Sequence, residues 1–345
     1  MITMTNSLGF QLPVTSAKMQ DTQSRMLRGN AMLFIVIWHI SIHAQRGELA
    51  THNIAIAFTT TGVNLFVLIS GFFRIKLKWK SLITILGTVI FFYTITLFLG
   101  TFLRDKQPSS RELMRFIGII SLNHWWFIRC YIELMLLSPL INLFLNKCNE
   151  KQYLYTLSIL ILMASVSGFI FGNPLNDNGR TTFQFLTIYI LGDSIRRFNL
   201  MDIMATKTLI LTYVIATAGI FLCTQITDKA YFYNNPFIII ASVSLFCLIS
   251  KKSFYNKRIN TIAKYMLPVY LLQESTIGAG TYSLLYKFGS TVNFDGIQYY
   301  GILLLYVILL FVGAVIMEKT RRFIMNKPID AISKYLDKKL DFFSF

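Results

Sequence analysis

An arginine and a histidine, Arg28 and His39, enclose ten mostly apolar residues, Gly-Asn-Ala-Met-Leu-Phe-Ile-Val-Ile-Trp. In an α-helix, steps of about 100° per residue bring both side chains to one face, roughly 16 Å apart along the axis. A guanidinium binds anions through several donors, and an imidazole exchanges protons near neutral pH. Inside a bilayer such ionisable groups are functional-site candidates. The alternative is that Arg28 only flanks a span and His39 is a satisfied core histidine.

Two glutamates in other apolar segments are expected at a depth similar to that of His39: Glu133 and Glu274. A carboxylate orients an imidazole and stabilises its cation, so either one could help His39 to move a proton. The alternative is that Arg129 neutralises Glu133 at i and i+4, while Glu274 pairs elsewhere in the bundle. His43 follows His39 by one turn, but the sequence offers no evident third ligand, so we expect no metal.

A second basic group follows the second apolar segment. Ser70 and Gly71 permit close helix approach or local unwinding, and Arg74 comes within one turn of them. We expect Arg28 and Arg74 to bind the phosphates of an anionic cosubstrate, because a guanidinium binds phosphate oxygens in pairs. Two nearby lysines could help: Lys76 and Lys78. The competing interpretation is that the small residues only pack against a neighbouring helix.

The composition is that of an integral membrane protein. The 345 residues are 54% hydrophobic, 15% aromatic and only 14% charged, which is too apolar for an ordinary soluble protein of this length. The net charge of +17 comes from short basic clusters between apolar runs, which indicate topology and contacts with anionic membrane lipid. We therefore expect no nucleic-acid partner. The four cysteines lack the spacing of a disulfide framework or a zinc site.

Runs of about 20 apolar residues predict ten membrane spans. They lie near 27–46, 54–73, 82–103, 125–146, 152–171, 182–196, 207–226, 236–250, 265–285 and 298–317. With the N-terminus in the cytoplasm, roughly three-quarters of the 33 Lys and Arg fall in inner segments. We predict an all-α, polytopic membrane helix bundle of about ten transmembrane helices, with both termini cytoplasmic.

The predicted loops are too short to hold a separate extramembrane domain. Residues 1–24 are polar and lack the pattern of a signal peptide, so we expect a disordered cytoplasmic lead. Residues 25–318 form the transmembrane domain, and residues 319–345 form a cytoplasmic, amphipathic basic tail.

Several short stretches together resemble the membrane-bound acyltransferase-3 family, bacterial enzymes that O-acetylate the O-antigen of lipopolysaccharide and other surface glycans. The likeness covers about Arg28 to Lys319 and begins with Arg28 and His39. The further stretches are Gly62-Val-Asn-Leu-Phe66 through Ser70-Gly71-Phe72, His124-Trp125-Trp126-Phe127 and Leu136-Leu-Ser-Pro-Leu140, with weaker echoes at Tyr189-Ile-Leu-Gly192 and Val269-Tyr-Leu-Leu272.

The resemblance implies that acetyl-CoA is the donor from the cytoplasm and that a lipid-linked or polymerised glycan is the acceptor beyond the bacterial inner membrane. It also implies that Arg28 and His39 are essential and that Arg74 has a role. Family members often carry a histidine where this chain has Gln273, which leaves Glu274 as the titratable group there. The candidate substrate-binding residues lie at the start of the fourth span: His124, Trp125, Trp126 and Arg129. For the two tryptophans, an interfacial aromatic belt is the alternative.

Other mechanisms stay open at this stage. His39 could act as general base on the acceptor hydroxyl, or it could carry the acetyl group itself. A transporter or flippase for lipid-linked saccharides would also use charges inside the membrane. The sequence shows neither paired broken helices nor an internal repeat, which many transporters carry. A glycan polymerase is a third interpretation, but the large outer loop usual in such enzymes is missing.

Overall fold

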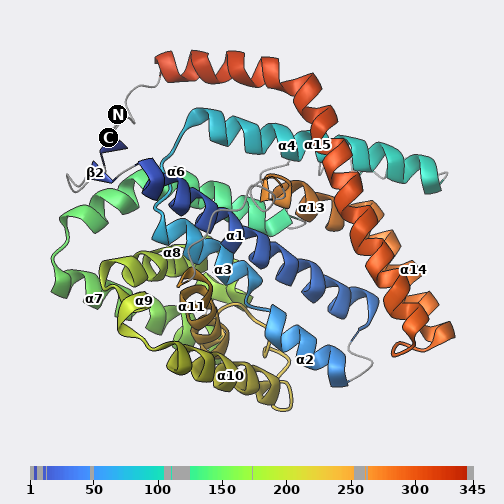
Figure 1. The fold of residues 1–345 in the computed structure, drawn as a ribbon, viewed down its shortest axis with the longest axis horizontal. Helices are drawn as coiled ribbons and strands as arrows, with labels where there is room; N and C mark the ends of the chain where they lie inside the picture. Colours follow the sequence, from blue (N-terminus) through green and yellow to red (C-terminus); the bar gives the residue numbers. More distant parts are fainter. Residues whose placement is uncertain are drawn as a thin grey trace.

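The computed structural model describes residues 4–5, 11–12, 14–46, 50–104, 110, 125–172, 174–251, 261 and 263–339. Within these ranges the protein is a bundle of helices, with one short pair of antiparallel strands near the N-terminus (Figure 1). The first elements are β1 (Met4–Thr5), β2 (Gln11–Leu12), α1 (Val14–His39), the π-helical turn η1 (Ile40–Ala44), α2 (Ala50–Thr59), α3 (Gly62–Phe72), α4 (Trp79–Arg104), α6 (Trp126–Lys147) and α7 (Glu150–Ile161). The remaining elements are η3 (Leu162–Ile170), η4 (Pro174–Gly179), α8 (Thr182–Arg197), α9 (Leu200–Ile203), α10 (Thr206–Cys223), α11 (Pro236–Ser250), α13 (Met266–Gln273), α14 (Thr276–Val292) and α15 (Ile297–Lys339).

The predicted fold class, a polytopic helical bundle, is confirmed. In the described ranges, seven helices are long and apolar enough to cross a membrane, and each matches one predicted span. Two further predicted spans correspond to short helices, α8 with 16 residues and α11 with 15 residues. The remaining one, 265–285, was expected to be continuous, but the structure divides it into α13 and α14.

The break between α13 and α14 falls at Glu274 and Ser275. The Ser275 side chain caps α14 by accepting a hydrogen bond from the Gly278 N–H (3.2 Å), and the Glu274 N–H donates to the Tyr270 carbonyl (3.0 Å). These bonds satisfy backbone groups that an interrupted helix would otherwise leave unpaired inside a membrane. A side chain at position 278 would clash with the Gln273 carbonyl, so the tight turn requires glycine. The break presents the Glu274 carboxylate to the bundle.

The first long helix, α1, carries Arg28 and His39 and packs between α3 and α13 (Figure 1). It is α-helical from Val14 to His39, so the predicted common face applies, and the π-helical turn begins directly after His39. This helix begins at Val14, within the residues 1–24 that were expected to form a disordered cytoplasmic lead.

Helices α3 and α8 cross with their backbones nearly in contact. A side chain at Gly71 would clash with the Tyr189 carbonyl, and one at Gly192 would clash with the Leu68 carbonyl. Small residues allow this separation, which maximises van der Waals contact between membrane helices. The expectation that Gly71 permits close helix approach is confirmed. Helices α3 and α8 form the most extensive contact between any two of the described elements.

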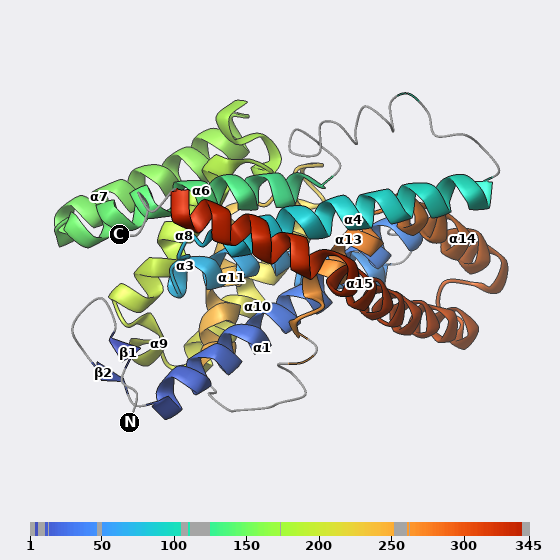
Figure 2. The ribbon, with the colours of Figure 1, turned by 90° about the horizontal axis from the view of Figure 1, so that it is seen from above.

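Helix α15 combines the last predicted span with the predicted basic tail. It runs without interruption from Ile297 to Lys339 and contains Pro328. Along its course the helix changes direction (Figure 1). Proline removes one backbone donor and clashes with the preceding turn, which accounts for the bend. Helix α15 packs along α4 (Figure 2), so its basic segment lies against the start of α4.

Candidate active site

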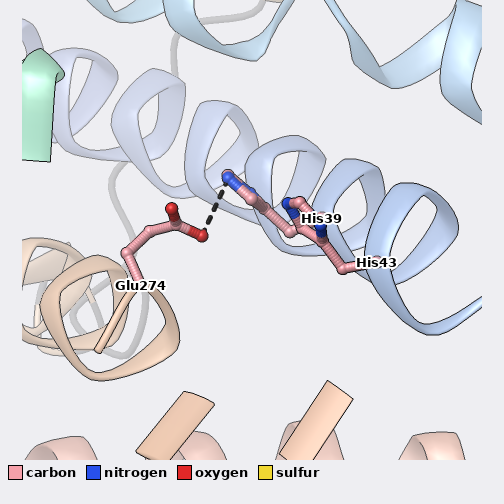
Figure 3. Close-up of side chains that lie close together, drawn as sticks. All are labelled: His39, His43 and Glu274. Atoms are coloured by element: carbon pink, nitrogen blue, oxygen red, sulfur yellow. Dashed lines mark ion pairs between the residues drawn. The ribbon is translucent and has the colours of Figure 1, made fainter. Parts of the chain in front are cut away.

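The bundle brings His39 of α1 together with Glu274 at the α13–α14 break (Figure 3). His39 Nε2 lies 3.0 Å from Glu274 Oε1, and His39 Nδ1 lies 2.7 Å from the Ile35 carbonyl oxygen. A carbonyl oxygen only accepts hydrogen bonds, so Nδ1 must carry a proton and donate it. Nε2 is then the nitrogen that faces the Glu274 carboxylate.

A second contact fixes α13 against α1. The Gln273 side-chain amide donates to the Val36 carbonyl (3.3 Å), three residues before His39. Gln273 is completely buried, and its Oε1 has no hydrogen-bond partner within the described part of the chain. Gln273 and Glu274 therefore both contact α1, and Gln273 holds the helix end that carries the carboxylate.

His43 completes a cluster of three groups. Its ring stacks on the ring of His39 with centroids 5.7 Å apart, and it also contacts Tyr282 (5.4 Å). The ligand atoms of His39, His43 and Glu274 all lie within 4.8 Å of one another, so the third metal ligand that the sequence did not reveal is present in the fold. The ion pair already occupies His39 Nε2 and Glu274 Oε1.

Two cavities meet beside the His39–Glu274 pair. A cavity of about 170 Å³ is lined by Arg28, and another of about 350 Å³ is lined by His39 and Glu274. Three side chains belong to the walls of both cavities: Ile35, Phe127 and Tyr270. Arg28 and His39 therefore border neighbouring spaces that a thin apolar partition separates. The Nε atom of Arg28 is buried and has no hydrogen-bond partner among the described residues.

The cavity at His39 has a wall of aromatic and charged side chains. Its aromatic members include Trp38, Trp126, Tyr231 and Tyr233, and its charged members besides Glu274 are Arg180 and Asp228. Trp126 was predicted as substrate-binding, and it does line this cavity, with Tyr233 (centroids 5.3 Å apart) and the Arg180 guanidinium (5.6 Å) against its ring.

The remaining members of this wall were not predicted. Arg180 and the 228–233 segment come from loops far from α1 in the sequence, and only the folded bundle places them beside His39. The short run Tyr-Phe-Tyr-Asn-Asn at 231–235, polar and aromatic between two apolar spans, was the available signal. A third cavity, of about 450 Å³, adjoins the same pair through His43 and Glu274.

The other predicted carboxylate, Glu133, does not reach His39. It accepts a hydrogen bond from the Thr182 hydroxyl and lies 4.0 Å from Arg129. Arg129 also approaches the Arg180 carbonyl (3.5 Å). Between the two glutamates that could orient the imidazole, the structure selects Glu274.

Two other residues were predicted to bind the substrate, Trp125 and His124. Trp125 is buried against Tyr93 (centroids 5.7 Å apart) and lines none of the three cavities around His39. His124 lies outside the described residues.

Arg74 is engaged by the protein and is not placed to bind phosphate. Its Nε and Nη2 donate to the two oxygens of Asp193 on α8 (2.8 and 3.2 Å), and Nη1 donates to Asn146. The expectation that Arg74 holds an anionic cosubstrate does not fit this geometry, because a buried carboxylate takes the place of the phosphate. Lys76 and Lys78 are exposed and line neither the Arg28 cavity nor the His39 cavity.

Comparison with known proteins identifies the family. The model of the acyltransferase-3 family, described as an acyltransferase domain, matches residues 23–319, which confirms the resemblance seen in the sequence. No curated protein and no solved structure matches the chain. The matched region contains α3, α8 and the His39–Glu274 pair. The chain therefore belongs to the acyltransferase-3 family and is a multi-pass membrane protein.

Proposed function

We propose that this protein transfers an acetyl group from cytoplasmic acetyl-CoA to a hydroxyl group of a surface glycan, lipid-linked or polymerised, at the bacterial inner membrane. Family membership supports acyl transfer in general. The observation that carries the more specific proposal is the position of the His39–Glu274 pair. It lies in the wall of the cavity lined by aromatic and charged side chains, which shares three wall residues with the cavity lined by Arg28.

The cavity at Arg28 suits the donor arm. Its volume of about 170 Å³ and its largely apolar wall, which includes Met32, Phe66 and Ile128, fit a slender chain such as pantetheine. Arg28 contributes a buried Nε without a partner, which favours an anionic or carbonyl oxygen nearby. The thioester would then reach His39 past Ile35, Phe127 and Tyr270, which have to move apart.

The cavity at His39 suits a polyhydroxylated acceptor. Aromatic rings such as Trp126 and Tyr233 offer flat apolar faces, while Arg180 and Asp228 supply a donor group and an acceptor group. Binding sites of this composition use a few polar groups to fix the orientation of a ligand that rests on apolar walls. In this arrangement a sugar ring lies on the aromatic side chains with one hydroxyl group directed at Nε2 of His39.

The chemistry follows from the protonation of His39. Nδ1 keeps its proton on the Ile35 carbonyl, so the lone pair that can act as a base is on Nε2. In the proposed step the acceptor hydroxyl replaces Glu274 Oε1 as the partner of Nε2 and gives its proton to that nitrogen, while the nearby Glu274 carboxylate stabilises the imidazolium. The hydroxyl oxygen attacks the thioester carbonyl, the carbon–sulfur bond breaks, and the departing thiolate takes the proton from Nε2. The products are the O-acetylated glycan and CoA. A route through acetyl-imidazole would use the same nitrogen.

The test is an assay with labelled acetyl-CoA and the purified protein in lipid vesicles, with glycan extracted from the producing cells as acceptor. Free CoA released only in the presence of acceptor, with label in the glycan, is the expected result. Mass spectrometry of the surface glycan from cells with and without the protein should show the gain of one acetyl group. Glycan that crosses the vesicle membrane without CoA, with no acetyl transfer, would overturn the proposal in favour of a transporter.

A further inference from the structure

A basic cleft adjoins the Arg28 cavity. It has a volume of about 340 Å³ and is built from α4, from the start of α13 with the residues just before it, and from the basic part of α15. Its charged members are Lys80, Lys264, Glu318, Arg321, Arg322 and Asp330. Lys264 and Leu267 line both this cleft and the Arg28 cavity, so the two spaces are neighbours.

The cations in the cleft outnumber the carboxylates. Glu318 is shared, because its carboxylate accepts from both Arg321 (2.8 Å) and Arg322 (2.7 Å). Lys80 pairs with Asp330 at 2.8 Å. Within the described residues Lys264 forms no ion pair, so its charge is available at the junction of the cleft and the Arg28 cavity.

Arg321 gives an independent indication of an anionic ligand. The residue is only 2% exposed, and its Nη1 is buried without a hydrogen-bond partner in the described part of the chain. In the adjacent cavity, the Nε atom of Arg28 is likewise buried without a hydrogen-bond partner among the described residues. A buried guanidinium nitrogen without an acceptor is unfavourable, and an anion that enters either space would provide the acceptor.

We infer that this basic cleft binds the phosphates at the nucleotide end of CoA, and that the pantetheine arm enters the Arg28 cavity past Lys264 and Leu267. This inference rests on the proposed function. It assigns the phosphates of the donor to Lys264, Arg321 and Arg322. The sequence had suggested other residues for them, Arg74, Lys76 and Lys78. The predicted topology places all three at the cytoplasmic side, where the donor is found.

The continuity between the cleft and the Arg28 cavity favours a soluble nucleotide over a lipid. An anionic headgroup presents the same phosphate chemistry, but its acyl chains extend into the bilayer. A nucleotide bound in the cleft by its phosphates would extend its pantetheine arm toward His39. The Arg28 cavity, which Lys264 also lines, is available for that arm.

The test measures CoA binding by the full-length protein in phosphatidylcholine nanodiscs. Lys264→Ala and Arg322→Ala should each raise the Kd for CoA about tenfold, as the loss of one charge-assisted hydrogen bond predicts. Lys319→Ala is the matched control, because Lys319 is an exposed cation on the same stretch of α15 that does not line the cleft. Dephospho-CoA should bind the wild type more weakly than CoA, and the two variants should reduce that difference.

Several outcomes would overturn the inference. If the wild type binds CoA and transfers acetyl groups while Lys264→Ala and Arg322→Ala leave the Kd unchanged, the cleft is not the donor site and the proposed function stands. If the variants instead lose bound phosphatidylglycerol when that lipid is added to the nanodiscs, the cleft binds a lipid headgroup. If the wild type binds no CoA, the proposed function itself is wrong.

Discussion

Two buried ion pairs join helices that are distant in the sequence, and they differ in what surrounds them. Asp193 is completely buried, and Arg74, Arg196 and Tyr153 all bond to its carboxylate. The Glu274 side chain is 21% exposed, and the His39–Glu274 pair borders cavities. Every guanidinium nitrogen of Arg74 donates to a protein acceptor, whereas the His39–Glu274 pair lies in the wall of open cavities.

The difference separates a structural role from a chemical one. Both pairs contain residues that sequence analysis selected as candidates, and both stabilise charge inside a membrane protein. Because the hydrogen-bond donors of Arg74 are used by protein acceptors, we infer that Arg74 holds the end of α3 against α8. An imidazole nitrogen beside a carboxylate at the edge of a cavity supports the acid–base role proposed for His39.

The largest effect is expected at His39. His39→Ala should reduce acetyl transfer by about 10³-fold or more, because it removes the nitrogen that takes the acceptor proton. The amount of protein in the membrane and its thermal unfolding temperature should change little, since a cavity already adjoins the side chain. Transfer assays and detergent thermal scans on the same preparation measure both. A variant that remains active would show that the His39–Glu274 pair is structural as well.

The next largest effect is expected at Arg74, where the substitution should lower stability and leave donor binding almost unchanged. Arg74→Ala leaves Asp193 buried without its bidentate partner, and breaking a buried pair costs about 3–5 kcal/mol. We expect a low yield of folded protein and a large drop in unfolding temperature, while the KM for acetyl-CoA of the folded fraction stays near the wild-type value. A stable variant with a strongly raised KM for acetyl-CoA would show that Arg74 does bind the donor.

A smaller effect is expected at Glu274. Glu274→Gln keeps the size of the side chain and a hydrogen-bonding group but removes the negative charge beside Nε2, so the imidazolium loses its stabilisation. We expect kcat to fall about 10²-fold with little change in the KM for either substrate. Glu133→Gln is the matched control, because Glu133 contacts Thr182 and Arg129 and does not reach His39. Equal losses in the two variants would contradict the assignment of Glu274.

The smallest effect is expected at the crossing of α3 and α8. Gly71→Ala forces a methyl group against the Tyr189 carbonyl, and overpacking of this kind costs about 1–3 kcal/mol. Gly301→Ala on α15 is the control, since a methyl group there meets open space. Thermal unfolding in detergent compares the two. If both variants unfold at the wild-type temperature, α3 and α8 are less rigidly joined than the Arg74 pair suggests.

Local patterns in the sequence predicted the helices and the common face of Arg28 and His39, because apolar runs and helical geometry depend on near neighbours. The partner of Arg74 was not predictable in this way, since Asp193 lies more than a hundred residues further along the chain. For His39 the sequence offered two glutamates, and only the packing of the helices excludes Glu133. The break at Ser275 had a local signal, a serine able to cap the following helix, but the long apolar run concealed it.

The partition formed by Ile35, Phe127 and Tyr270 has a consequence for the cell that makes this protein. If the protein receives one substrate from each face of the membrane, as proposed, an open passage between the two cavities would also let ions cross. The three side chains that line both cavities would then have a second task, to keep that passage closed to ions while no substrate is bound. Smaller residues at these positions are then expected to increase proton leak across the membrane, a cost that no soluble transferase faces.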